Sequence, residues 1–152
     1  EIADEYSEIK TEKALVDALT MWFIKNPQHF DVLVASNLFG DIITDLGAIL
    51  QGGLGFAAGG NINPEKKYPS MFEPIHGSAP KYQGKNVVNP IATILAVKMM
   101  FDHLGEKSAG ELIEESVSSV IEDKKIKTKD MGGNTKTSEV GDAVKRKLLE
   151  LA

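Results

Sequence analysis

An apolar run that leads directly into a helical pattern, over residues 31–45, constrains the fold more than any other part of this chain. Residues 32–35, Val-Leu-Val-Ala, are continuously apolar, which is typical of a strand buried on both faces. We therefore expect a buried strand over 31–35, followed by a helix over about 37–51 that Gly52-Gly53 ends. A strand, a turn and a helix in this order favour an α/β fold whose ligands bind beyond the carboxyl ends of the strands.

Asp41 and Asp45 lie four residues apart in this predicted helix, so their carboxylates share one face. Two carboxylates at this spacing repel each other by about 0.2–0.5 kcal/mol. A divalent cation such as Mg²⁺ or Mn²⁺ reverses that effect, because it prefers hard oxygen ligands. The spacing leaves two interpretations open, a metal site or a solvated acidic helix face.

The first part of the chain contains one more predicted helix and one weak strand signal. Apolar residues at helical spacing predict a helix over about 13–25, which Asn26-Pro27 ends. The alternation around Tyr6–Lys10 predicts a short strand. In the helix over 37–51, the residues expected on the buried side are Leu38, Ile42, Leu46, Ile49 and Leu50.

Three more helices are expected in the last part of the chain. Asn89-Pro90 has the features of a helix start, with Asn as the cap and Pro in the first turn, and Gly105 closes that helix. The spacing within Ser108–Glu111 is that of a capping box at the start of the next helix. Thr137 is expected to cap the last one.

Two loops between these helices contain small residues in unusual density. Residues 52–60 are nearly all glycine and alanine, which fits either a segment that another backbone or a ligand approaches closely, or a flexible hinge. In the second loop, His76 is followed by Gly77, Ser78 and Ala79. Small residues leave backbone N–H groups accessible to a phosphate, and His76 can donate to an anion or stack on a flat ring. The alternative is a partly exposed loop histidine.

Composition excludes several classes of protein. The chain has 152 residues, no cysteine and a net charge of −5 with scattered lysines. A disulfide framework, a thiolate metal site, nucleic-acid binding and membrane binding are therefore not expected, and the localisation predicted is cytoplasmic. The chain starts without Met, so we expect a piece of a longer protein.

Five motifs, in order along the chain, resemble the isocitrate and isopropylmalate dehydrogenase family. Residues 37–45, Asn-Leu-Phe-Gly-Asp-Ile-Ile-Thr-Asp, resemble that family's metal-site helix, and residues 73–80, Glu-Pro-Ile-His-Gly-Ser-Ala-Pro, resemble its cofactor loop. Val16-Asp17-Ala18, Asn89-Pro90 and Met131-Gly132-Gly133 are similar to further family elements. The resemblance covers nearly the whole chain.

The resemblance implies an α/β fold, the C-terminal portion of a two-domain dehydrogenase with helices packed on a mixed sheet. Residues 1–51 would end the second, dimer-forming domain, and residues 52–152 would return to the first, nucleotide-binding domain. Family members oxidise a malate-like 2-hydroxy acid with NAD or NADP and Mg²⁺ or Mn²⁺, after which the product loses carbon dioxide. The catalytic tyrosine and lysine and the substrate arginines of the family lie upstream of Glu1, so the chain alone is expected to be inactive.

The resemblance also implies the site residues. The metal would be held by Asp41 and Asp45 together with Asp17 from the neighbouring subunit of a homodimer, so that the active site is shared. The cofactor-binding positions would be Glu73, His76, Gly77, Ser78, Ala79, Lys81, Tyr82, Val88, Asn89 and Asp130. No residue of this chain other than the metal ligands matches a catalytic position.

The preferences for cofactor and substrate stay open on the sequence. Lys81, Tyr82 and Val88 resemble the NADP-using members, in which a cation and a phenol hold the 2′-phosphate, whereas Asp130 resembles the NAD-using members. We favour NADP over NAD. Residues 61–72 look most like the tartrate and D-malate dehydrogenase branch, with isopropylmalate and isocitrate as alternatives. A non-catalytic assembly or regulatory subunit and a free-standing interaction module are the competing functions.

Overall fold

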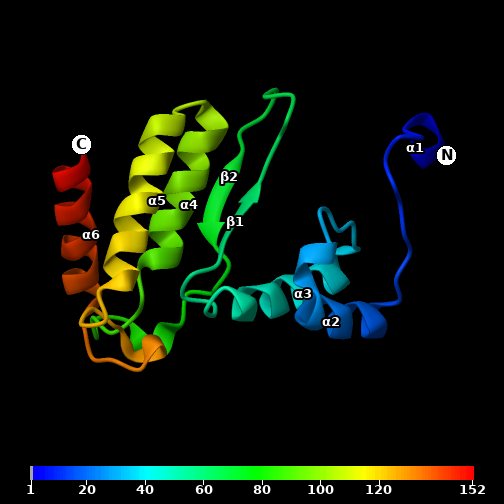
Figure 1. Ribbon diagram of the computed structural model, residues 1–152. Coiled ribbons are helices and arrows are strands. Elements are labelled where there is room, and N and C mark those ends of the chain that lie inside the picture. The colour runs from blue at the N-terminus through cyan, green and yellow to red at the C-terminus, as the bar shows by residue number, and fades with distance from the viewer. Residues whose placement is uncertain (1) are drawn as a thin grey trace. The chain divides into compact units, whose positions relative to one another are not determined.

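The chain forms two compact units, residues 1–50 and residues 51–152. A computed structural model describes residues 2–152 (Figure 1). Each unit has its own packing and is described by itself. That the two units belong to different domains of a longer chain stays a prediction.

The first unit is helical. It contains α1 (Ile2–Glu5), α2 (Val16–Lys25), a 3₁₀ turn η1 (Pro27–His29) and α3 (Asn37–Leu50). Helices α2 and α3 pack together, and the ring of Phe23 lies where a side chain on Gly47 would otherwise stand. The buried side chains are few, namely Leu19, Ile43 and Ala48.

Two expectations for this unit are wrong. Residues 31–35 form no strand, and Val32 and Val34 are 83% and 97% exposed. A strand needs a neighbour to pair its backbone, and no described residue pairs with this run. The alternation at 6–10 also yields a turn rather than a strand.

The buried side predicted for α3 is also wrong. The helix packs on α2 through Ile43 and Ala48, which leaves most of the predicted apolar side exposed. The exposed members are Leu38, Ile42, Ile49 and Leu50. The bounds of α3 agree with the prediction, since positive φ angles at Gly52 (112°) and Gly53 (106°) end the helical run.

The second unit packs a hairpin and helices in successive layers (Figure 1). Strands β1 (Ala58–Asn61) and β2 (Met71–Pro74) are antiparallel, with Ala58 opposite Pro74 and Asn61 opposite Met71. Helix α4 (Ile91–Leu104) lies against both strands, α5 (Lys107–Glu122) packs on α4, and α6 (Thr137–Leu151) packs on α5. Two 3₁₀ turns, η2 (Pro80–Tyr82) and η3 (Lys129–Met131), lie in the connecting loops.

The core of this unit lies between α4, α5 and α6. Its buried members are Ile91, Ile113, Val117, Val120, Val140, Ala143 and Val144. Within α5 and α6 they recur at three- and four-residue spacing, so each of these two helices presents one apolar stripe to its neighbour. Phe56 and Ile126, from the loops, pack against this cluster.

The predicted helix ends are right in part at α4 and wrong at α5 and α6. Helix α4 begins at Ile91 with Pro90 as its cap residue, one position later than predicted. Asn89 Oδ1 accepts the N–H of Ile91 at 3.0 Å, and Gly105 closes α4 with a φ of 90°. Helix α5 begins one residue before Ser108, so the predicted capping box does not form. Thr137 lies inside α6, where its hydroxyl donates to the carbonyl of Val88 instead of capping the helix.

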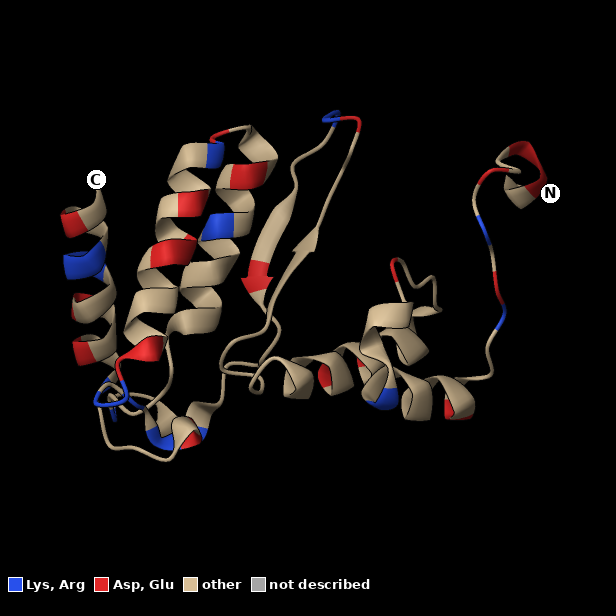
Figure 2. Cartoon of the chain, viewed as in Figure 1, with Lys and Arg blue, Asp and Glu red and all other residues tan. Residues whose placement is uncertain are grey.

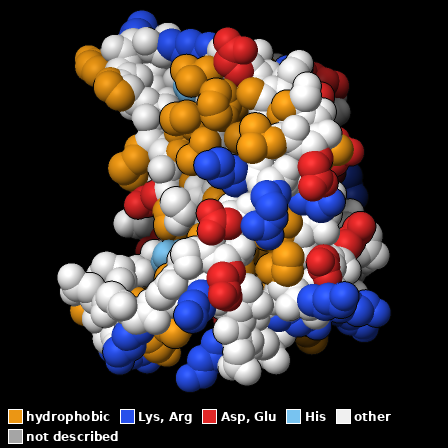
Figure 3. Space-filling view, turned by 90° about the vertical axis from the view of Figure 1, so that its left-hand side faces the viewer, with side chains coloured by type: hydrophobic (Ala, Val, Ile, Leu, Met, Phe, Trp, Pro, Cys, Tyr) orange, Lys and Arg blue, Asp and Glu red, His pale blue; other side chains and the backbone are white. Residues whose placement is uncertain are grey.

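Charged residues of both signs occur at intervals along these helices (Figure 2). Lys98 on α4 bridges to Glu114 on α5 at 2.8 Å and to Asp102 at 2.9 Å. Figure 3, with α6 towards the viewer, shows hydrophobic side chains gathered in the upper part of that face and charged ones over the rest. Among residues 2–152, no helix is both long and apolar enough to cross a bilayer.

Candidate functional site

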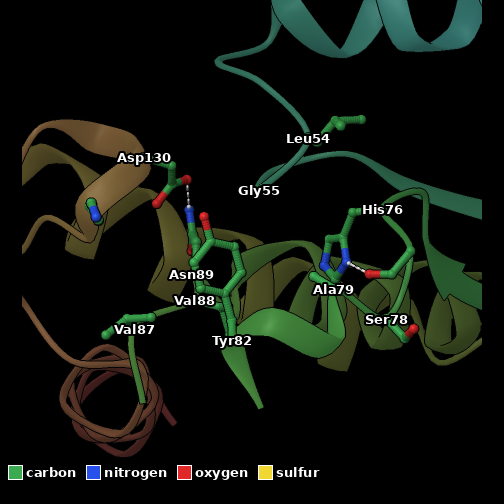
Figure 4. Close-up of a pocket in the computed structure, with 12 residues that line it drawn as sticks. Leu54, Gly55, His76, Ser78, Ala79, Tyr82, Val87, Val88, Asn89 and Asp130 are labelled. Atoms are coloured by element: carbon green, nitrogen blue, oxygen red, sulfur yellow. Dashed lines mark hydrogen bonds between the residues drawn. The ribbon is translucent and has the colours of Figure 1, made fainter. Parts of the chain in front are cut away.

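A pocket of about 590 Å³ lies in the second unit, where four loop segments meet (Figure 4). Its walls come from residues 54–55, 76–79, 82, 87–89 and 129–130. The lining residues are Leu54, Gly55, His76, Gly77, Ser78, Ala79, Tyr82, Val87, Val88, Asn89, Lys129 and Asp130. Leucine and valine side chains with the Tyr82 ring make an apolar surface, and an amide, a carboxylate and an imidazole supply the polar groups.

The hairpin positions the histidine loop. Strand β2 ends at Pro74, and the N–H of Ile75 donates to the carbonyl of Ala57 at 3.0 Å, which extends the pairing by one step. The chain then turns into the pocket wall, and Ala79 takes a left-handed conformation with a φ of 43°. His76 Nδ1–H donates to the carbonyl of Gly77 at 3.0 Å, so Nε2 is the nitrogen that remains for a ligand.

Asn89 and Asp130 form a fixed polar pair in the pocket (Figure 4). Asn89 Nδ2 donates to Asp130 Oδ2 at 3.1 Å, while Asn89 Oδ1 accepts the N–H of Ile91. The other carboxylate oxygen of Asp130 accepts the hydroxyl of Thr128, which is fully buried. Both side chains are therefore held in one orientation, because each end of the pair has a second partner.

Gly55 completes this arrangement. A Cβ atom at this position would overlap Asp130 Oδ2 and would lie 2.9 Å from Asn89 Nδ2. The carbonyl of Gly55 accepts the N–H of Ala92 at 2.9 Å, which satisfies one of the free donors at the start of α4. The close approach at Gly55 is thus made by two side chains, whereas the expectation for the glycine-rich run was a backbone or a ligand.

Most of the predicted cofactor positions meet in this pocket, although they come from three separate stretches of sequence. Those that line it are His76, Gly77, Ser78, Ala79, Tyr82, Val88, Asn89 and Asp130. Glu73 and Lys81 do not line it: Glu73 pairs with Gly59 in the hairpin, and Lys81 Nζ lies 4.9 Å from the centre of the Tyr82 ring. That any of these residues binds a cofactor stays a prediction.

Four lining residues were absent from the predicted set, namely Leu54, Gly55, Val87 and Lys129. The density of glycine over 52–60 was the available signal for the first two. Lys129 belongs to a basic run that composition alone assigns to solvated loop, and Val87 carries no signal apart from its neighbours.

The predicted metal ligands lie in the first unit. Asp41 and Asp45 are exposed on the same face of α3, and neither carboxylate has a partner among the described residues. Asp17 is exposed near the start of α2, where Oδ1 accepts the N–H of Ala18 at 2.8 Å. Across residues 2–152, no three His, Cys, Asp or Glu side chains gather into a metal-binding group. The structure thus brings Asp41 and Asp45 together without Asp17.

Comparison with known sequences gives the family of this chain. The sequence pattern of the isocitrate/isopropylmalate dehydrogenase family matches residues 1–144. The chain belongs to this family. A probable tartrate dehydrogenase/decarboxylase of Bacillus subtilis is 48% identical over 149 residues, which is 98% of this chain and 42% of that protein. A 3-isopropylmalate dehydrogenase of Thermobifida fusca is 47% identical over 150 residues, covering 99% of this chain and 41% of its own length.

Solved structures of family members agree with these sequence matches. The crystal structure of an isocitrate dehydrogenase from Methylococcus capsulatus matches with a TM-score of 0.88 and 43% identity, over 97% of this chain and 43% of that one. The α/β fold expected of the isocitrate/isopropylmalate dehydrogenase family is therefore confirmed. The chain spans about two fifths of the length of the relatives it matches.

Proposed function

We propose that the pocket of the second unit binds the adenosine part of NAD or NADP, and that the longer protein is a decarboxylating dehydrogenase of a malate-like 2-hydroxy acid. The observation that supports this most directly is the convergence of the eight lining positions named above. They lie on three segments of the sequence, at 76–82, 88–89 and 130, and form one pocket. Random surface positions would not gather in this way.

The chemistry of the pocket suits such a ligand. Its volume is within the range of about 300–1,000 Å³ that is usual for small-molecule sites. The apolar side chains and the Tyr82 ring offer a surface for a flat base, and the Asn89–Asp130 pair offers fixed hydrogen-bonding groups. Backbone N–H groups over Gly77–Ala79, with Nε2 of His76, would face the phosphates.

The metal would bind in the first unit, at the acidic face of α3. Asp41 and Asp45 fit this role, since two partnerless carboxylates on one helix face offer hard oxygen donors to Mg²⁺ or Mn²⁺. Such an ion, when bound, stabilises the negative charge that develops on the substrate oxygen. We propose that Asp17 is contributed by the neighbouring subunit of a homodimer, which agrees with the finding that, among residues 2–152, it forms no metal-binding group with the other two aspartates.

The substrate belongs by this proposal to the tartrate, D-malate, isopropylmalate or isocitrate class. The relative from Bacillus subtilis favours the tartrate branch. Between the cofactors, Lys81 and Tyr82 favour NADP, because a cation and a phenol pair well with a phosphate. Asp130 favours NAD, because its carboxylate repels the phosphate that distinguishes NADP.

The test replaces the cation beside the pocket in the full-length protein. Lys81→Asp should lower the ratio of kcat/KM for NADP to that for NAD by about tenfold or more, as expected when a charge-assisted hydrogen bond is lost and a like charge is added. Calorimetric titration of each nucleotide into the wild-type and variant proteins gives the matching dissociation constants.

Lys85→Asp is the matched control, because it makes the same charge change in the same loop at a residue outside the pocket lining. An unchanged ratio in Lys81→Asp would contradict the NADP assignment. Failure of the wild-type protein to bind either nucleotide would contradict the proposed function as a whole.

A further inference from the structure

One wall of the pocket is fastened to the start of α6 by four hydrogen bonds, which we call the Asn86 clamp. The carbonyl of Asn86 accepts the N–H of Thr137 at 3.1 Å, and Asn86 Oδ1 accepts the N–H of Ser138 at 3.0 Å. Asn86 Nδ2 donates to Ser138 Oγ at 3.0 Å, and the Thr137 hydroxyl donates to the carbonyl of Val88 at 2.6 Å. The clamp joins residues 49 to 52 positions apart in the sequence.

The conformation of Asn86 fits this role. Its backbone has a φ of 55°, in the left-handed region that residues other than Gly, Asn and Asp rarely adopt. Glycine would adopt the same backbone more easily but would lose both side-chain bonds to Ser138. Asparagine is thus a residue that accepts this backbone and still fastens the loop.

The clamp acts on residues that line the pocket: Val88 is itself a lining residue, whereas Asn86, Thr137 and Ser138 are not. Val87, Val88 and Asn89 follow Asn86 directly, and Asn89 is fixed again where its side chain accepts the N–H of Ile91. The wall is therefore held at both ends of a span of only a few residues. Without the bonds at Asn86, this end of the span would keep only the hydrogen bond from the Thr137 hydroxyl to the carbonyl of Val88, while the buried end at Asn89 would stay in place.

We propose that Asn86 is a positioning residue for the nucleotide: through Ser138 and Thr137 it holds Val88 and Asn89 where the adenosine part binds. This inference rests on the proposed function. No residue of α6 lines the pocket, so α6 would contribute to nucleotide binding only indirectly, by holding the loop in place. A loop held in place before binding loses less conformational freedom when the ligand arrives.

The test compares three variants of the full-length protein. Asn86→Gly keeps the left-handed backbone and removes both side-chain bonds, and we expect the Kd for the nucleotide to rise roughly fivefold. Asn86→Asp should restore it to within about twofold of wild type, because a carboxylate accepts from both the N–H and the hydroxyl of Ser138 and suits a helix N-terminus. Asn134→Gly, an exposed asparagine in a nearby turn, is the matched control and should leave the Kd unchanged.

The kinetic readout separates positioning from general damage. In Asn86→Gly, the KM for the nucleotide should rise while the kcat at saturating nucleotide and the Kd for Mn²⁺ stay the same. An unchanged nucleotide Kd in this variant, with normal binding by wild type, would overturn the inference and leave the proposed function intact. Equal losses of nucleotide and Mn²⁺ binding, or no rescue by Asn86→Asp, would also overturn it. Absence of nucleotide binding by wild type would overturn both.

Discussion

Of the two glycines that line the pocket, Gly55 has no room for a side chain, whereas Gly77 does. The missing side chain of Gly55 leaves the space that the Asp130 carboxylate and the Asn89 amide occupy, and its carbonyl is bound to the start of α4. Both neighbours are fixed by further hydrogen bonds to Thr128 and Ile91, so neither can move aside at low cost. Overpacking at a site of this kind costs about 1–3 kcal/mol.

We therefore predict that Gly55→Ala lowers the free energy of unfolding by about 1–3 kcal/mol and weakens nucleotide binding. Urea unfolding and calorimetric titration of the full-length protein measure the two effects. Gly141→Ala is the control, because a Cβ on that residue of α6 meets nothing within 4 Å. That change should stabilise the helix slightly. If both variants have the same free energy of unfolding, the prediction that a side chain on Gly55 is overpacked is wrong.

Single residues also show how far the sequence can predict a site. The glycine density over 52–60 and the small residues after His76 were visible signals, and both segments line the pocket. The contact of Asn89 with Asp130 was not predictable from pattern, because it joins residues 41 positions apart. The clamp at Asn86 was missed for the same reason, since nothing local to an Asn-Val-Val run points to Ser138.

Among the helices, α4 and α5 are joined by charge as well as by apolar packing. Lys98 is only 24% exposed and bonds to Glu114 and to Asp102, while Gly110 gives the Asp102 carboxylate room beside α5. The hydrogen bonds that Lys98 donates to the Glu114 and Asp102 carboxylates hold the pKa of Lys98 above its usual value. The charged form of Lys98 is thus more favourable in the folded protein than in the unfolded chain.

Lys98→Met should lower the free energy of unfolding of the full-length protein by about 0.5–1 kcal/mol near pH 8. Because the folded-state pKa is raised, this stabilisation is fully present below pH 10.5, the usual lysine value, and is lost as the pH rises through the higher folded-state pKa. Urea unfolding at pH 8 and above pH 11 measures both differences. Lys145→Met, at an exposed lysine of α6, should change the free energy of unfolding at neither pH. If Lys98→Met lowers this free energy equally at both pH values, the loss is one of packing and not of charge.

Element boundaries were easier to predict than element surroundings. Local backbone preferences at the glycines and at Asn89-Pro90 predicted the ends of α3 and α4 to within one residue. The strand over 31–35 and the buried side of α3 were wrong, because burial depends on which other segments pack there. The caps at Ser108 and Thr137 were wrong because the Thr137 hydroxyl bonds to Val88, and α5 starts earlier at Lys107.

At the scale of the whole molecule, the first unit is poorly covered by its own residues. Val32, Val34 and Leu38 are among its most exposed side chains, although their types are those of buried positions. The chain spans only about two fifths of the relatives it matches. We expect the remaining part of such a protein, and a second subunit, to cover these side chains.

If a homodimer shares its metal site between subunits, two variants that each lose Mn²⁺ binding should restore it when their subunits are mixed. Full-length subunits with Asp17→Asn and others with Asp41→Asn should each bind Mn²⁺ at least about tenfold more weakly than wild type. Mixed dimers of the two should regain one intact site, so an equal mixture recovers about a quarter of the wild-type sites. Calorimetric titration counts them.

The control for these metal variants is Asp142→Asn, the same substitution at an exposed position of α6, which should leave the number of Mn²⁺ sites unchanged. If the mixture recovers no sites, Asp17 and Asp41 act within one subunit and the shared arrangement is wrong. If Asp41→Asn binds Mn²⁺ as wild type does, α3 is not the metal helix.

The hydrogen bonds at Asn86 also bear on protein engineering. A graft meant to change the coenzyme preference would exchange the loop that carries Lys81 and Tyr82, about residues 80–88. In this protein such a graft would lack the hydrogen-bond partners of the loop, because Thr137 and Ser138 lie on α6, about fifty positions later in the sequence. A successful exchange would have to transfer two distant stretches of sequence as one unit.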